Sequence, residues 1–161
     1  MNEIPAGVPE AAPWSMFAGT LGRGSVLASV VFFVIALLAM VAARRISKLD
    51  KIGVVSFVLG CVSLFVAFGA LTALFVRDQF QYQYVWSHSD TTTSLAYKVA
   101  SVWTAQEGSF LLWGCGSAVF ALLALAGTGA YKRGFVGVYS LFLACIGGIL
   151  AYETPFENHN A

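Results

Sequence analysis

The sequence predicts an all-α membrane protein that crosses a lipid bilayer with four helices. Its composition, four long apolar runs and the placement of its charges predict this class. Hydrophobic residues make up 58% of the 161 residues and charged residues only 11%, whereas soluble domains carry about 25% charged residues. Nine basic and eight acidic residues nearly cancel, so net charge gives no reason to expect a nucleic-acid partner.

Four runs without a charged side chain predict the spans: 24–43, 52–76, 108–131 and 134–152. A helix needs about 20 residues to cross the ~30 Å hydrocarbon core. Backbone amides in lipid must pair within their own segment, so runs of this length are expected to be helical. We therefore expect four transmembrane helices in a single membrane domain that covers residues 1–161.

The charges predict the orientation of these helices. The two short connections, 44–51 and 132–133, hold six of the nine basic residues. Both termini and the long 77–107 connection hold seven of the eight acidic residues. Because Lys and Arg near short loops stay on the cytoplasmic side, we expect the termini, the long loop and the 153–161 tail on the outer, periplasmic face.

The outward loop contains an alternating aromatic segment. It reads QFQYQYVW over 79–86, which places aromatic side chains at every second position: Phe80, Tyr82, Tyr84 and Trp86. Strict alternation indicates an extended segment with one aromatic face. This outward aromatic surface either anchors the loop at the membrane interface, where Tyr and Trp are enriched, or docks a partner or a flat hydrophobic ligand.

A short interfacial helix is expected at the end of this loop, over residues 95–106, where helical periodicity returns. It leads into the string WTAQEGSFLLW at 103–113, which opens the third span. Glu107 either caps free amides at the start of that span or is a polar contact at the rim of a ligand site. The candidate rim residues of a partner or haem site are Trp103, Gln106, Glu107, Gly108, Ser109 and Trp113.

The patterns for catalysis and metal binding are weak. His88 and His159 are isolated; each fits a solvated histidine better than a haem ligand. Cys61, Cys115 and Cys145 lie in three different runs without a C-x-x-C pair, so we expect small core residues. No residue is assigned to catalysis or to a metal.

Small residues at four-residue spacing predict the packing faces of the last two spans. Gly114 and Ala118 form one stripe, and Ser140, Ala144 and Gly148 form the other. Such stripes let membrane helices approach closely. No ionisable residue falls at mid-membrane depth, which argues against a self-contained transporter or channel.

Three strings carry a family resemblance: YVWSHSD at 84–90, YKVASVW at 97–103 and QEGSFLLW at 106–113. They resemble the CcmF/NrfE family of cytochrome c-type biogenesis proteins, the haem lyase subunits. The TPF string at 154–156 resembles the family's Asn-Pro-Phe, whereas Thr104 and Ala105 replace its usual Gly-Gly or Gly-Ala. The resemblance covers residues 17–156 and is densest over 76–113, and members of the family are several times longer.

This resemblance implies a part in attaching haem to apocytochrome c on the outer side of the cytoplasmic membrane. The chain would supply the N-terminal four-helix portion and would not be catalytic alone. The family's WWD motif and haem-ligand histidines lie beyond the matching residues. We therefore expect haem in the complex to be held by a partner protein that carries the remaining helices, with apocytochrome c as an indirect partner.

The expected location is the cytoplasmic (inner) membrane, with an organellar inner membrane as the alternative. A second function stays open, that of an accessory or structural membrane subunit of another complex derived from this family. A transporter or channel is the third and weakest alternative, for the lack of intramembrane charges given above.

Overall fold

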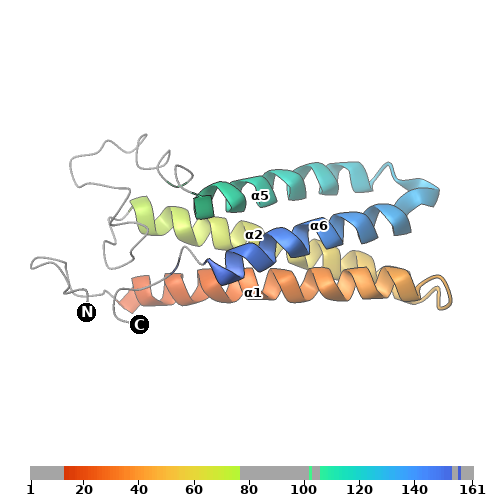
Figure 1. The fold of residues 1–161 in the computed structure, drawn as a ribbon, viewed down its shortest axis with the longest axis horizontal. Coiled ribbons are helices and arrows are strands. Elements are labelled where there is room, and N and C mark those ends of the chain that lie inside the picture. The colour runs from red at the N-terminus through yellow and green to blue at the C-terminus, as the bar shows by residue number, and fades with distance from the viewer. Residues whose placement is uncertain (1–12, 77–101, 103–105, 154–155, 157–161) are drawn as a thin grey trace, which may run out of the picture.

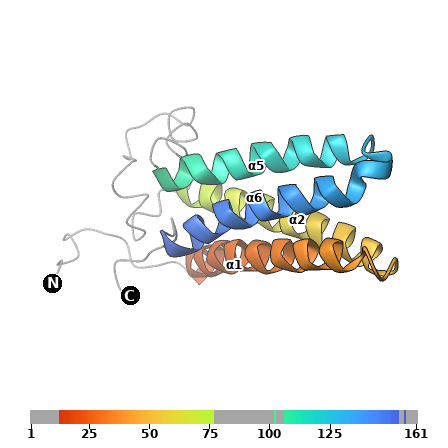
Figure 2. The same ribbon diagram turned by 45° about the vertical axis from the view of Figure 1, so that its right-hand side comes forward.

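Four long helices run side by side in the computed structural model, which describes residues 13–76, 102, 106–153 and 156 (Figures 1 and 2). They are α1 (Pro13–Ala42), α2 (Leu49–Val76), α5 (Gln106–Leu125) and α6 (Lys132–Tyr152), with the short 3-10 turn η1 (Gly129–Tyr131) before α6. All four are long and apolar enough to cross a membrane. The predicted all-α class with four apolar helices is confirmed, and the chain is a multi-pass membrane protein.

The bounds of α1 and α5 differ most from the charge-free runs. α1 begins at Pro13, 11 residues before the run that starts at Gly24, and includes the exposed Arg23. The additional turns pack onto the bundle, because Ser15 is fully buried and Trp14 lies against the core. At about 1.5 Å per residue, the 30 residues of α1 exceed the ~30 Å hydrocarbon core. The helix is thus longer than a bilayer requires.

α5 ends earlier than its run. Its last residue is Leu125, and the next turn contains Gly127 and Gly129. Gly129 has a φ of 47°, which glycine adopts without a steric penalty. This left-handed residue reverses the chain direction, so that α6 begins only seven residues after α5 ends.

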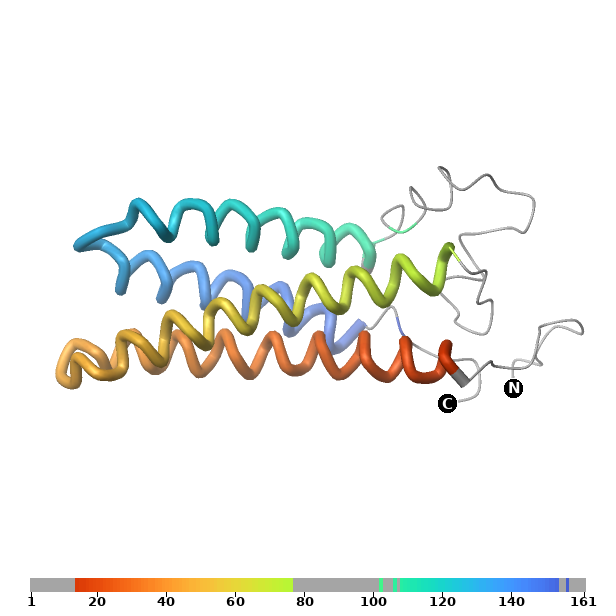
Figure 3. Tube along the Cα trace, turned by 180° about the vertical axis from the view of Figure 1, so that it is seen from behind, coloured from red at the N-terminus to blue at the C-terminus, as the bar shows by residue number. Residues whose placement is uncertain are grey.

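α1 and α2 share the most extensive interface, and α6 packs against an adjacent face of α1. α5 packs against α6 and α2 on the side of the bundle away from α1, as Figures 1 and 3 show. The core between the helices is made of aromatic and aliphatic side chains such as Phe33, Phe57, Leu64 and Leu143, all fully buried. Phe33 and Phe57 lie with their ring centroids 5.9 Å apart.

The predicted small-residue stripes are only partly in the interfaces. Gly114, Ala118 and Ser140 are buried, but Gly148 is exposed and its neighbour Gly147 makes the close approach, to Val30 of α1. Steps of four residues advance a helix by 400°, about 40° more than a full turn. A stripe of three such positions therefore rotates out of a straight interface.

At one end of the bundle α1 begins, α2 ends, α5 begins and α6 ends (Figure 1). We call this the long-loop end. The opposite, short-loop end carries the 43–48 connection and η1.

Candidate functional site

The first two turns of α5 carry most of the predicted rim residues that the structure describes. The helix begins at Gln106 and includes Glu107, Gly108, Ser109 and Trp113. Gln106 and Trp113 are exposed, whereas Gly108 is buried. Residues seven apart return to nearly the same side of a helix, so Gln106 and Trp113 share one face. The predicted rim is therefore divided between the outside and the inside of the bundle.

The exposed face of α5 continues along the whole helix. Trp113 is 71% exposed, and Phe120 and Leu123, near the end of α5, are each 70% exposed. We define the α5 outer face by these apolar residues together with the exposed residues beside them: Leu112, Trp113, Val119, Phe120 and Leu123. No other described helix covers it.

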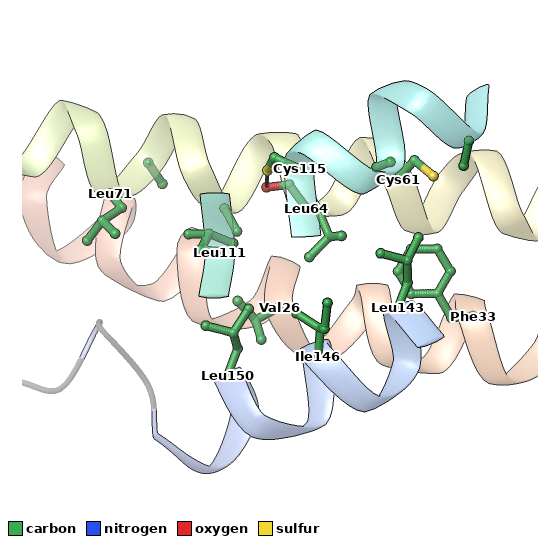
Figure 4. Close-up of a cluster of buried hydrophobic side chains, with 14 of the residues drawn as sticks. Val26, Phe33, Cys61, Leu64, Leu71, Leu111, Cys115, Leu143, Ile146 and Leu150 are labelled. Carbon is green, nitrogen blue, oxygen red and sulfur yellow. Dashed lines mark hydrogen bonds between the residues drawn. The ribbon is translucent and has the colours of Figure 1, made fainter. Parts of the chain in front are cut away.

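The opposite face of α5 fixes the helix to the bundle (Figure 4). Leu111 and Ala118 are fully buried, and the Cys115 thiol donates a hydrogen bond to the Leu64 carbonyl at 3.5 Å. Gly114 faces Ile146 and Leu64 closely: a Cβ atom there would lie 3.4 Å and 3.6 Å from them. This packing determines which side of α5 is free.

Two further residues at the long-loop end were not among the predicted site residues. Val102, just before α5, is fully buried. Phe156, after α6, is 4% exposed and lies against Gly22 of α1, where a Cβ atom would be only 2.3 Å from its ring. Phe156 belongs to the TPF string noted for its resemblance, but nothing in the sequence pairs it with Gly22.

The other predicted site residues lie outside the described residues. These are the outward aromatic surface, the histidine beside it and the first rim residue: Phe80, Tyr82, Tyr84, Trp86, His88 and Trp103. The predicted interfacial helix over 95–106 also lies there, apart from Val102 and Gln106.

The described residues do not fit a haem-iron site. They contain no histidine, since His88 and His159 both lie outside them. They also contain no group of three or more His, Cys, Asp or Glu side chains that could hold a metal. Cys61 and Cys115 are buried inside the bundle, while Cys145 is exposed on α6. The prediction that all three cysteines are core residues is wrong for Cys145 in this chain.

The short-loop end is basic. Arg44, Arg45, Lys48, Lys51, Lys132 and Arg133 gather there. Arg133 forms a two-point ion pair with Asp50, with Nε to Oδ1 at 2.6 Å and Nη2 to Oδ2 at 2.5 Å. Both side chains are partly exposed. The pair ties the start of α6 to the start of α2.

Comparison with known proteins identifies the relatives of this chain. It is 45% identical over 51 residues to the cytochrome c-type biogenesis protein CcmF of Haemophilus influenzae, a match of 32% of this chain and 8% of that protein. It is 43% identical over 65 residues to cytochrome c-type biogenesis protein ccl1 of Rhodobacter capsulatus, a match of 40% of this chain and 10% of that protein. A third relative is the probable cytochrome c-type biogenesis protein NrfE of Escherichia coli K12, 46% identical over 50 residues, or 31% of this chain and 9% of that protein.

A solved structure named cytochrome c heme lyase CcmF superimposes on 94% of this chain with a TM-score of 0.82 at 24% sequence identity. This chain resembles the CcmF/NrfE proteins. The structural match covers 26% of the solved CcmF chain, and the sequence matches cover at most 10% of the three relatives named above. No family model matches the chain. The resemblance to CcmF/NrfE proteins that the motifs predicted is confirmed.

Proposed function

We propose that this chain forms a four-helix membrane part of a cytochrome c maturation complex, equivalent to the N-terminal portion of CcmF/NrfE proteins. The observation that carries the proposal is the sequence similarity to relatives named as cytochrome c-type biogenesis proteins. The similarity of fold across nearly the whole chain supports it. In this proposal, the four-helix chain supports haem delivery and attachment to apocytochrome c on the outer side of the cytoplasmic membrane.

The proposed complex includes a second protein that holds the haem. That partner carries the remaining helices and the haem-ligand histidines of the family. In lipid, helices associate through close packing rather than through the hydrophobic effect. The α5 outer face, which no described helix covers, offers large side chains for such packing.

The rim residues would act by positioning the partner rather than by chemistry. Trp113 and Gln106 point away from the bundle on the α5 outer side, at the long-loop end where the proposed partner's periplasmic segments would lie. Aromatic side chains supply a large contact area in interfaces. The expected role of this chain is to hold the haem-bearing half at the outer membrane surface.

The partner is tested by purifying the chain from native membranes in a mild detergent. Mass spectrometry of the co-purifying chains and a haem absorption spectrum of the complex are the readouts. Haem together with a chain that matches the remainder of CcmF supports the proposal. A haem-free complex with unrelated chains contradicts it and favours an accessory subunit of another complex.

A variant of the α5 outer face tests the role in maturation. Trp113→Ala should lower the amount of holocytochrome c several-fold, because among the described residues it removes the largest exposed side chain near the long-loop end. Leu141→Ala is the matched control, since Leu141 is 53% exposed on α6 and lies outside the α5 outer face. The measurement is haem staining of membranes that contain equal amounts of each variant. Equal holocytochrome c in both variants would contradict the proposed role of Trp113.

Glu107→Ala should lower holocytochrome c in the same assay without changing insertion into the membrane. Glu107 is the second residue of α5, and a negative charge at the start of a helix is favoured by the helix dipole. Normal holocytochrome c at normal expression would remove Glu107 from the proposed rim.

A further inference from the structure

The structure contains a groove between α1 and α6 at the short-loop end. The groove has a volume of about 200 Å³. Leu37, Met40 and Val41 of α1 line one side, and Gly137 and Val138 of α6 line the other. Val41 and Val138 are 59% and 69% exposed, so the groove opens on the outside of the bundle. In a membrane this outside surface faces lipid.

The groove changes from apolar to charged along its length. Arg44 lines it two residues after α1 ends, and Arg133 lines it in the first turn of α6. Helix ends with basic side chains lie at the level of lipid headgroups. The apolar part of the groove thus lies at the depth of an acyl chain, and its arginines lie at the depth of the phosphate.

The charges around the groove favour an anion. The short-loop end holds six basic side chains, and Asp50 is its one acidic residue in the described chain. Asp50 is already paired with Arg133 through two hydrogen bonds. Arg44 has no ion pair among the described residues. α6 also presents the positive end of its helix dipole here, with no acidic residue in its first turn.

We propose that this groove is a binding site for an anionic phospholipid, with Arg44 at the phosphate and an acyl chain between α1 and α6. Basic pockets between membrane helices bind anionic headgroups by the same physical principle. The site is distinct from the α5 outer face and does not depend on the proposed part in cytochrome c maturation.

Two glycines make room for the acyl chain. A Cβ atom at Gly134 would have nothing within 4 Å, and one at Gly137 would only touch Met40 and Leu37, at 3.9 Å and 4.0 Å. A large side chain at Gly134 would therefore occupy the groove without forcing α1 and α6 apart. This gives a variant that blocks the site while leaving the bundle intact.

The test is native mass spectrometry of the full chain in detergent with added phosphatidylglycerol or phosphatidylcholine of the same acyl chains. Wild-type protein should retain phosphatidylglycerol in preference to phosphatidylcholine. Arg44→Gln should lower the bound phosphatidylglycerol about fivefold, the effect of one basic residue near an anionic surface. Gly134→Leu should lower it at least as much.

Matched controls separate the groove from the general surface charge. Arg45→Gln removes a neighbouring exposed arginine that does not line the groove, and Gly148→Leu adds the same side chain at another open glycine of α6. Both should bind phosphatidylglycerol as wild type does. Equal loss in the Arg45 variant, or equal retention of the two lipids by wild type, overturns the proposal. Displacement of the lipid by inorganic phosphate also overturns it, because it would indicate a site for the free anion.

Discussion

Gly60 of α2 leaves no room for a side chain. A Cβ atom there would lie 2.6 Å from Cε1 and 2.8 Å from Cδ1 of Phe33. Phe33 is fully buried and packs against Phe57, so its ring has no free space to move into. Gly60→Ala should therefore lower the free energy of unfolding by about 1–3 kcal/mol, the usual penalty for overpacking a core.

Gly69 is the matched control for this prediction, because it lies on the same helix with nothing within 4 Å of its Cβ position. Gly69→Ala should leave stability unchanged or raise it, since alanine has the higher helix propensity. The measurement is unfolding of both variants in mixed detergent micelles. Equal stability of the two variants would mean that Phe33 does not press on Gly60.

Phe156 holds the segment after α6 against α1. Its ring is almost fully buried and occupies the space that a side chain at Gly22 would need. Phe156→Ala should release this segment while the four helices stay packed, because Phe156 lies beyond the end of α6 at Tyr152. Limited proteolysis should then cut near the C-terminus several times faster.

Gly22→Ala should also make proteolysis near the C-terminus faster, because its methyl group would occupy the place of the Phe156 ring. Gly24→Ala is its control, since a Cβ at Gly24 meets nothing within 4 Å. Unchanged proteolysis in both the Phe156 and the Gly22 variants would show that the segment is held by other contacts.

For the individual helices, the sequence predicted their presence better than the residues at which they begin and end. An apolar run long enough to cross a bilayer satisfies its own backbone hydrogen bonds by forming a helix. α2 and α6 therefore closely follow the runs over 52–76 and 134–152. The start of α1 was not predictable from charge, because Arg23 is tolerated on an exposed helical face. The turn after α5 contains Gly129 in a left-handed conformation. A glycine in the sequence does not show which φ it will adopt, so the end of α5 was not predictable.

The Asp50–Arg133 pair links two helices that start 83 residues apart. Its side chains are 32% and 46% exposed, so solvent and salt weaken the attraction. Arg133→Lys should lose the two-point geometry, because lysine is a point donor. A double-mutant cycle with Asp50→Asn should give a small coupling energy that falls as salt is raised. Coupling that does not change with salt would contradict a solvent-exposed pair.

For the whole molecule, the sequence predicted that the candidate rim residues lie at the start of a helix, but not which side of that helix each one faces. The sequence placed the rim residues at the start of the third span, and the structure begins α5 at Gln106. Periodicity puts Gln106 and Trp113 on one face, but every face of this apolar helix is compatible with lipid. Only the packing of Leu111 and Cys115 against α2 and α6 determines that Gly108 is inside and Trp113 outside.

The charge distribution predicts the orientation in the membrane, with the short-loop end on the cytoplasmic side. Six of the nine basic residues lie at the short-loop end, and positive charge near short loops is retained in the cytoplasm. Exposed aromatic residues at both ends of α6, Tyr131 and Tyr152, fit the two membrane interfaces. The 21 residues of α6 span about 31 Å, close to the ~30 Å of hydrocarbon.

Labelling with a membrane-impermeant maleimide in intact cells tests this orientation. Asn158→Cys should react from outside, and Ser47→Cys should react only after permeabilisation. The unaltered chain is the control; its Cys61 and Cys115 are buried in the bundle, and Cys145 lies within the apolar span of α6, so a charged reagent should reach none of them. Labelling of Ser47→Cys alone in intact cells would mean that the bundle is inverted. The basic groove would then face the outer leaflet, and the α5 start would face the cytoplasm, away from apocytochrome c.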